Sequence, residues 1–262
     1  MKHFYGYGSW EARYWLVSHE EGGGDFPEEV ADKVNWFAAN HPETDKTLCD
    51  IRALYKHVAY HGEGTKADLY NNFCDYRFGP DATPNTIWRN LTDFTSGFDD
   101  KPKKDTLTYQ QKEFASPDSK REALIRLYPL PCPHNHAWYY SWLGLPGFEF
   151  LRTRAQYEEA LYEQRIGAIL SRLQTHTPEV VLMYGMKNIN RLKQSFSKHF
   201  GGVKFKQAKA IKLKLPQHHY ADIKGSQFVI TTQIPALRHN RIETGFDWVY
   251  FGQMVREVKV ES

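Results

Sequence analysis

Two adjacent carboxylates stand beside three consecutive glycines near the amino terminus, a combination that can hold a ligand closely and activate water. The residues are Glu20, Glu21, Gly22, Gly23 and Gly24, directly after an apolar run. Glycine lets the backbone approach a ligand, and a neighbouring carboxylate can orient or deprotonate water. The alternative is a flexible turn whose acids are merely solvated. A P-loop is excluded, because no Gly-Lys-Ser or Gly-Lys-Thr follows the glycines.

A proline-rich segment at 128–136 ends in His134, Asn135 and His136. Prolines end strands and build rigid loops, which is the plain interpretation of this segment. The three letters match the name of HNH nucleases, but the nuclease residues are dispersed through a ββα unit and are not adjacent. A metal bound by His134, His136 and Glu20 stays open as an alternative. We expect no metal and no organic cofactor.

The segment with the clearest functional pattern places a leucine among cations after a strand. An apolar run ends near Gln233, a proline turns the chain, and Leu237 is followed by Arg238, His239 and Arg241. Such a leucine is typical of a wedge that enters a base stack while the cations hold phosphates. The alternative is that Leu237 caps the core and the arginines cover the start of a helix.

The charge of the chain is unevenly distributed, although the net charge is only +3. Residues 180–221 contain no Asp or Glu, and the acids therefore concentrate elsewhere. One-sided charge of this kind is typical of a surface that meets phosphates, whereas the plain interpretation is a solvated face. We expect DNA contacts from Lys187 and Asn188 and from the other cations of this stretch, which are Arg191, Lys193, Lys198, Lys204, Lys206, Lys209, Lys212 and Lys214.

Four apolar runs must position these segments, and their low charge predicts strands covered on both faces. They are residues 12–19, 123–128, 180–184 and 227–232. Helical patterns separate them, at 28–39, 44–60, 84–94, 154–173, 187–199 and 246–258. Strands alternating with helices predict an α/β fold with a central, mainly parallel, four-stranded sheet. Reactive groups then gather beyond the carboxyl ends of the strands.

The composition indicates one domain over residues 1–262, with a surface loop or insertion near 96–119. Cys49, Cys74 and Cys132 are far apart and form no CxxC pair, which argues against zinc, an iron–sulfur cluster or a disulfide scaffold. The sequence has no apolar leader and no apolar run long enough to span a membrane. We therefore expect a cytoplasmic protein with no obligate protein partner.

The order of these segments resembles the uracil-DNA glycosylase superfamily. Those enzymes place a polar motif after the first strand, a proline-containing loop after a later strand and an intercalating loop after the last. The resemblance implies a three-layer α/β/α fold and hydrolysis of the N-glycosidic bond of a flipped-out base. It places Glu20, or else Glu21, at the catalytic carboxylate and Gly22 where a tyrosine blocks bases with a C5 substituent. The first motif here lacks the proline that is usual in the family, and Thr232 or Gln233 replaces its histidine.

The open C5 side implied by Gly22 fits one branch of the superfamily, which removes glucosylated hydroxymethylcytosine from phage DNA. The resemblance then assigns a base pocket to His19, Gly22, Gly23, Phe26, Asn135 and Gln233. It assigns DNA contacts to Leu237, Arg238, His239, Arg241, Lys187 and Asn188.

Three other functions stay open at this point. The first is repair of uracil or another deaminated base. The second is a nucleic-acid-binding module of the same fold without catalysis, which the absence of the family's histidine favours. The third is an α/β enzyme that processes small nucleotides or sugars, with the glycines around a phosphate.

Overall fold

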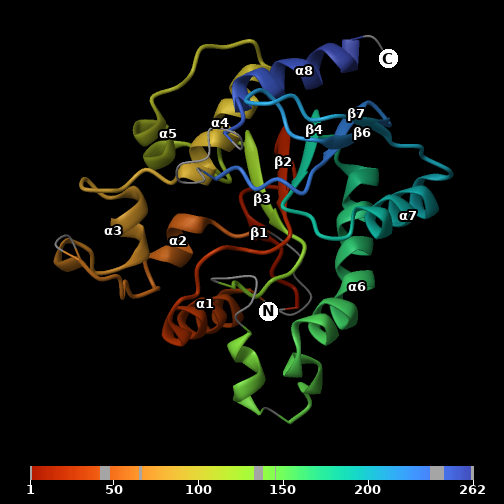
Figure 1. Cartoon of the computed structure of the whole chain (residues 1–262). Coiled ribbons are helices and arrows are strands. Elements are labelled where there is room, and N and C mark those ends of the chain that lie inside the picture. Colours follow the sequence, from red (N-terminus) through yellow and green to blue (C-terminus); the bar gives the residue numbers. More distant parts are fainter. Residues whose placement is uncertain are drawn as a thin grey trace.

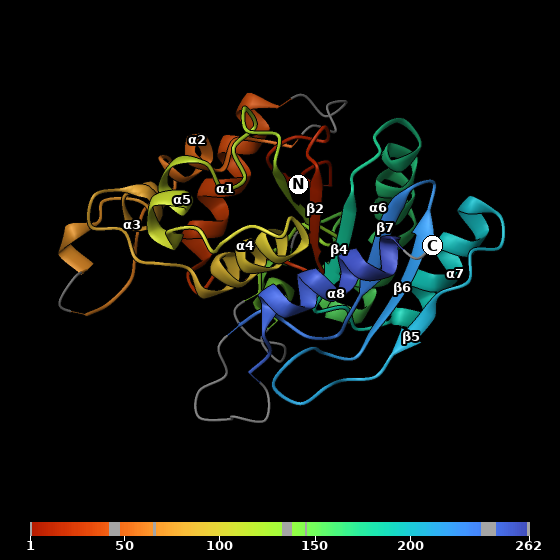
Figure 2. The ribbon, with the colours of Figure 1, turned by 90° about the horizontal axis from the view of Figure 1, so that it is seen from above.

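The described part of the chain is an α/β structure built on a mixed sheet of seven strands, with helices on both sides of its central part (Figures 1 and 2). The computed structural model describes residues 2–41, 48–64, 67–132, 138–144, 146–236 and 245–260. The strand order is β1-β3-β2-β4-β7-β6-β5. The strands are β1 (Gly6–Tyr7), β2 (Tyr14–Ser18), β3 (Glu122–Arg126), β4 (Val180–Tyr184), β5 (Lys206–Ala208), β6 (His218–Ile223) and β7 (Ser226–Ile230).

The four predicted apolar runs form the parallel centre of this sheet, in the order β3-β2-β4-β7. Every residue of these four strands is buried, which explains why they read as continuous apolar runs. The predicted count of four strands was wrong for the whole sheet. Antiparallel pairing adds β1 at one edge, and β6 and β5 at the other. These additions are short or polar, and β5 is largely exposed, so hydrophobic pattern alone gave no signal for them.

The side chains of the central strands alternate between two cores. Trp15 and Val17 point to one face, where α6 (Arg154–Thr175) and α7 (Ile189–Phe200) cover the sheet. Tyr14 and Leu16 point to the other face, which is covered by α2 (Ile51–Tyr55), α4 (Thr86–Phe98), α5 (Thr106–Lys112) and α8 (Trp248–Val260). The remaining helices are α1 (Pro27–Asn40), α3 (Phe73–Phe78) and the 3-10 turns η1 (Ala67–Leu69), η2 (Tyr139–Leu143) and η3 (Glu149–Arg152).

The helix predicted over 44–60 was wrong over most of the range that the structure describes. Residues 42–47 lie outside the described part of the chain. Cys49 pairs with Tyr7 in a parallel bridge, and the helix begins only after Asp50, whose side chain accepts a hydrogen bond from the Arg52 N–H. A hydrogen-bonding cap therefore ends one local structure and starts another inside a run whose apolar spacing looked helical.

The segment 96–119, expected as a surface loop or insertion, contains ordered structure. Helix α4 continues to Phe98, and α5 follows after an Asp105 cap. Tyr109 of α5 is buried, and its hydroxyl donates to the buried carboxylate of Glu122 at 2.7 Å. This long-range contact cannot be read from local periodicity. No helix of the described residues is both long and apolar enough to cross a membrane.

Candidate functional site

A cavity of about 590 Å³ lies at the carboxyl ends of β2 and β4. The chain leaves β2 toward β3 on one side and later reaches β4 on the other side. Neighbouring strands whose connections run in opposite directions form a topological switch point, where α/β proteins most often bind ligands. The cavity is lined from β2 and its glycine turn, from β3 and β4, and from α1, α2 and the segment 60–88.

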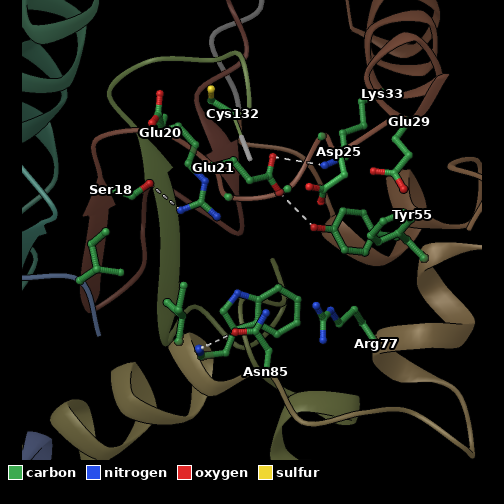
Figure 3. Close-up of a pocket in the computed structure, with 18 of the residues that line it drawn as sticks. Ser18, Glu20, Glu21, Asp25, Glu29, Lys33, Tyr55, Arg77, Asn85 and Cys132 are labelled. Carbon is green, nitrogen blue, oxygen red and sulfur yellow. Dashed lines mark hydrogen bonds and ion pairs between the residues drawn. The ribbon is translucent and has the colours of Figure 1, made fainter. Parts of the chain in front are cut away.

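Glu21 forms the floor of this cavity. Its Oε1 accepts hydrogen bonds from the Tyr7 and Tyr55 hydroxyls, both at 3.0 Å, and Lys33 Nζ lies 3.5 Å from its Oε2 (Figure 3). Burial by itself raises the pKa of this carboxyl, but the cations of Lys33 and Arg126 and the two tyrosine hydrogen bonds outweigh burial and lower it. Glu21 is therefore an ionised carboxylate at neutral pH, fixed in one orientation.

Arg126 brings a buried guanidinium to the same floor from the last residue of β3. Its Nη1 donates to the Ser18 hydroxyl at 2.8 Å and to the Tyr184 hydroxyl at 3.4 Å. Its Nε has no hydrogen-bond partner in the described part of the chain. The three side chains come from the paired ends of β3, β2 and β4, so the register of the sheet fixes their arrangement.

Glu20 occupies a different environment from its neighbour. Its two carboxylate oxygens lie 2.8 and 2.9 Å from Nη1 of Arg154, at the first residue of α6. Arg154 also contacts the Cys132 thiol. Figure 3 shows Glu20 and Glu21 pointing apart, with Glu21 toward Lys33 and Tyr55. Both acids line the cavity, but it is Glu21 that forms its floor.

Glu29 is another carboxyl in this cavity, which Asp25 also lines, and its protonation differs from that of Glu21. It lies in the first turn of α1 with 4% of its surface exposed, and it lines the cavity. Burial, reinforced by the negative charges of Asp25, Asp32 and Glu28, raises its pKa to about 7, although Lys33 opposes this rise. The site thus includes an ionised carboxylate at Glu21 and, at Glu29, a carboxyl that exchanges its proton near neutral pH.

The glycine turn joins the two carboxyl-bearing elements. Gly23 and Gly24 have φ angles of +95° and +76°, which residues with a side chain rarely adopt. A Cβ on Gly24 would stand 3.0 Å from Pro131 Cγ, and the Gly24 carbonyl accepts a hydrogen bond from the Tyr139 hydroxyl at 2.6 Å. Gly22 instead faces open space, because a Cβ there would meet no atom within 4 Å.

The wall opposite Glu21 is aromatic, with polar groups at its edge. Arg77 stacks on Tyr76 with its guanidinium carbon 4.1 Å from the ring centroid. Asn85 caps α4 by accepting a hydrogen bond from the Trp88 N–H at 3.1 Å. Figure 3 shows Arg77 and Asn85 across the cavity from Glu21. The aromatic side chains that line the cavity are Phe26, Tyr55, Tyr60, Phe73, Tyr76, Trp88 and Tyr184.

The structure brings several predicted pocket residues together at this cavity. His19, Gly22, Gly23 and Phe26 all line it. The His19 ring nitrogen Nε2 lies 3.0 Å from the Glu158 carboxylate, and Phe26 packs against His61. Gln233 lies beside the cavity, since its carbonyl accepts a hydrogen bond from the Gly185 N–H, but its side chain amide donates to the Ile234 carbonyl.

The predicted DNA contacts are only partly described. Lys187 lines the cavity and pairs with Glu158 at 3.1 Å, and Asn188 caps α7 by accepting from the Arg191 N–H. The other predicted cations of the acid-free stretch, from Arg191 to Lys214, are described and do not line the cavity. Asn135 of the predicted base pocket and the predicted DNA contacts Leu237, Arg238, His239 and Arg241 lie outside the described part of the chain, as do His134 and His136. Within the described ranges, no three or more His, Cys, Asp or Glu side chains are grouped as metal ligands.

The sequence reasoning missed Glu29, Lys33, Tyr55 and Arg126. Arg126 carried a usable signal, because it is the one charged residue in the apolar run 123–128. A charge inside a buried strand requires a partner and often marks a site. Glu29 and Lys33 are four residues apart on a helix, and this spacing is also that of an ordinary solvated ion pair, so it gave no signal.

Comparisons with known proteins found no relative. No protein-family model matches this sequence, and no curated protein matches it significantly.

Proposed function

We propose that the protein is a DNA glycosylase that flips a bulky C5-modified cytosine out of the duplex and hydrolyses its N-glycosidic bond, leaving an abasic site. The observation that carries this proposal is that two of the carboxyls lining one cavity differ in pKa, with that of Glu21 lowered and that of Glu29 raised to about 7. Glycoside hydrolases commonly break a glycosidic bond with two carboxyls whose surroundings give them different pKa values.

Each carboxyl has a defined part in this reaction. The C1′–N bond breaks, its electron pair moves to the base, and positive charge develops on the sugar. Glu21 is ionised and stabilises that charge, while protonated Glu29 gives its proton to the departing base. Water adds to C1′, and the proton that it loses restores the acid through solvent. The buried Arg126 guanidinium, whose Nε has no hydrogen-bond partner among the described residues, stabilises the electron-rich base at the floor.

The dimensions of the cavity support a bulky base. A volume of about 590 Å³ is in the range that accommodates a drug-sized ligand, and a single pyrimidine ring would leave much of it empty. Open space at Gly22 leaves room beside the C5 position that the resemblance assigns to it. Glucosylated hydroxymethylcytosine in phage DNA is a substrate of this size and shape. Aromatic rings and polar edges on the opposite wall suit stacking and hydrogen bonding to such a group.

We also propose a fold of the uracil-DNA glycosylase type, a reaction without cofactor and a cytoplasmic location. The helices on both sides of the parallel strands support a three-layer α/β/α arrangement of the uracil-DNA glycosylase type. The chemistry requires only water, DNA and the side chains of this chain, so no metal or organic cofactor takes part. A protein that acts on invading DNA works in the cytoplasm.

The test incubates the protein with duplexes that contain uracil, hypoxanthine, hydroxymethylcytosine or its glucosylated form, followed by alkaline cleavage at abasic sites. Strand breaks confined to the glucosylated base support the proposal. Breaks at uracil assign the protein to repair instead. Release from free nucleosides but not from duplex assigns it to small-molecule metabolism. DNA binding without release of any base contradicts the catalytic proposal and leaves a binding module.

A second variant tests the specificity directly. Gly22→Tyr places a ring in the open space beside the glycine turn, where Gly22→Ala adds only a methyl group. We expect the tyrosine variant to lose release of the glucosylated base at least tenfold more strongly than that of hydroxymethylcytosine. Gly22→Ala keeps the wild-type preference. Equal losses on both bases would contradict the assignment of Gly22 to the C5 side.

A further inference from the structure

The acid-free stretch 180–221 includes a short hairpin between β5 and β6 that the chemistry of the cavity does not use. Residues 209–215, named here the lysine hairpin, have the sequence Lys-Ala-Ile-Lys-Leu-Lys-Leu. Ile211 and Leu215 pair across it through two backbone hydrogen bonds of 2.9 and 3.0 Å. The Asp247 N–H donates to the Lys214 carbonyl at 3.0 Å and ties the hairpin to the start of α8. Leu215 is buried beneath it.

The outer surface of the lysine hairpin alternates cations with apolar side chains. Lys209, Lys212 and Lys214 are exposed, and Ile211 and Leu213 expose 45% and 42% of their surface. Leu213 has φ +61°, a left-handed conformation that is uncommon for a branched side chain. Neither Lys209 nor Lys212 has an ion-pair partner among the described residues. A constrained tip whose lysines have no ion-pair partner in the described part of the chain suits an anionic surface that also offers apolar contacts.

The strand register places this hairpin at the same end of the sheet as the cavity. β7 is parallel to β4 and β2, whose ends line the cavity, and β6 is antiparallel to β7 with His219 opposite Ile230. Ala208, the last residue of β5, pairs with His218, so the chain leaves β5 at that same end. In Figure 2 the light-blue segment between β5 and β6 extends beyond the end of β6 at the bottom of the view.

We infer that the lysine hairpin binds the phosphate backbone of duplex DNA beside the nucleotide held in the cavity. Three strand spacings separate β2 from β6, which is about 15 Å at about 4.8 Å per spacing. At about 3.4 Å of axis per base pair, the hairpin meets the duplex roughly four base pairs from the flipped nucleotide. Lys209 and Lys212 contact phosphates, while Leu213 packs against the sugar edge of the groove. This placement rests on the proposed function.

The same stretch supplies a matched control. Lys198 and Lys204 are exposed and belong to the same acid-free sequence, but Lys198 lies in the last turn of α7. That helix starts beyond the carboxyl end of β4 and returns to the opposite end of the sheet. Lys204 precedes β5 at that opposite end, because Lys206 pairs with Tyr220 in mid-sheet. The charge pattern alone predicted DNA contacts for Lys198 and Lys204 as well, but the structure places both away from the cavity end of the sheet, so we expect none from them. The two pairs of lysines thus carry equal charge and differ in position.

The experiment measures duplex affinity against salt concentration for the wild type, Lys209→Gln with Lys212→Gln, and Lys198→Gln with Lys204→Gln. Each lost phosphate contact lowers the slope of log affinity against log salt by about 0.9. We expect the first double variant to lose about 1.8 from the slope, and the second to keep the wild-type slope. Leu213→Asn, which tolerates the left-handed backbone, weakens binding severalfold without changing the slope. Unchanged melting temperatures exclude misfolding of these surface variants.

Three outcomes overturn the inference. One is an equal slope for the wild type and for Lys209→Gln with Lys212→Gln. Another is no duplex binding by the wild type, and a third is an effect of the hairpin lysines on phosphatidylserine vesicles but not on DNA. The base-release assay is read separately. If the base is released but the salt slope does not depend on the hairpin lysines, the hairpin inference is wrong and the glycosylase proposal stands. If the salt slope depends on these lysines but no base is released, the glycosylase proposal is wrong and the DNA-binding surface stands.

Discussion

At the scale of single residues, neighbours in sequence occupy different electrostatic environments. Glu20 pairs with a cation from α6, and Glu21 is fixed among two tyrosines, Lys33 and Arg126. Glu29 has carboxylates around it and a raised pKa. The charge state of each carboxyl follows from its contacts and not from its residue type. Two predictions on Glu29 follow at this scale.

The first concerns activity. Glu29→Gln removes the proton donor, and we expect base release to fall about 10²- to 10⁴-fold near neutral pH. Because the acid acts in its protonated form, wild-type release falls as pH rises through about 7, and the variant loses this dependence. Single-turnover release measured from pH 5.5 to 8.5 gives both values. Glu28→Gln, an exposed neighbour on the same helix, is the control. It keeps the release rate at low pH, and because the Glu28 charge helps to raise the Glu29 pKa, its profile moves slightly to lower pH without being lost.

A substrate with a better leaving group separates proton donation from a structural effect. An electron-withdrawing substituent on the base reduces its need for a proton. Glu29→Gln should therefore recover activity on that substrate far more than on the ordinary one. An equal loss on both substrates contradicts the role of Glu29 as an acid.

The second prediction concerns stability. The pKa of Glu29 rises from 4.5 to about 7 on folding, so between these values the folded state binds more protons than the unfolded state. Stability therefore falls as pH rises across this window. The limit is about 3 kcal/mol, and solvent in the open cavity reduces the effect to about 1–2 kcal/mol. Glu29→Gln should thus unfold at a higher denaturant concentration than the wild type at pH 8, and this gain should shrink by pH 5. If Glu29→Gln is no more stable than the wild type at pH 8, the ionised Glu29 carboxylate does not destabilise the folded state.

At the scale of elements, the sequence predicted what local pattern determines. The four parallel strands lie within two residues of the predicted runs, because burial on both faces makes them continuously apolar. Helices α1, α4, α6, α7 and α8 also match predicted patterns. β1 and α5 depend on pairing with distant segments, such as Tyr109 with Glu122. β5 and β6 pair with their neighbours in sequence, but they are short or polar and so carry no apolar signal.

The candidate site divides in the same way. The glycine turn after β2 was visible because chemistry and chain punctuation coincide there. Arg126, Tyr55 and Glu29 reach the cavity from three other elements, and only tertiary packing brings them to Glu21. Sequence spacing therefore indicated where the site begins, and not which residues complete it.

The turn itself yields an element-scale prediction. Gly24→Ala forces a side chain into a left-handed backbone and to within 3.0 Å of Pro131. We expect a loss of about 1–3 kcal/mol in unfolding free energy and a loss of activity, since the turn joins Glu21 to α1. Gly22→Ala, with no positive φ and no contact within 4 Å, should change stability by under about 0.5 kcal/mol. Urea unfolding compares the two variants, and equal effects would show that the turn is not held in this conformation.

At the scale of the whole molecule, ligand binding and stability are linked, because a ligand that binds only the folded state raises the melting temperature. The cavity draws its walls from β2, β3, β4, α1 and α2, so an occupied site connects elements from both halves of the sequence. A duplex that carries a cationic pyrrolidine in place of the target sugar imitates the charge of the transition state. A duplex with a neutral tetrahydrofuran at that position has the same shape without the charge.

Glu21 must distinguish these two duplexes if it stabilises positive charge on the sugar. Enzymes bind transition-state mimics at least about 10²-fold more tightly than ground-state ligands, which is about 2.7 kcal/mol. We expect the pyrrolidine duplex to raise the melting temperature several degrees more than the tetrahydrofuran duplex at equal concentration. Glu21→Gln should abolish this difference and keep the tetrahydrofuran shift, whereas Glu20→Gln, whose partner is Arg154, should retain most of it. A difference that persists in Glu21→Gln and disappears in Glu20→Gln would transfer the electrostatic role to Glu20.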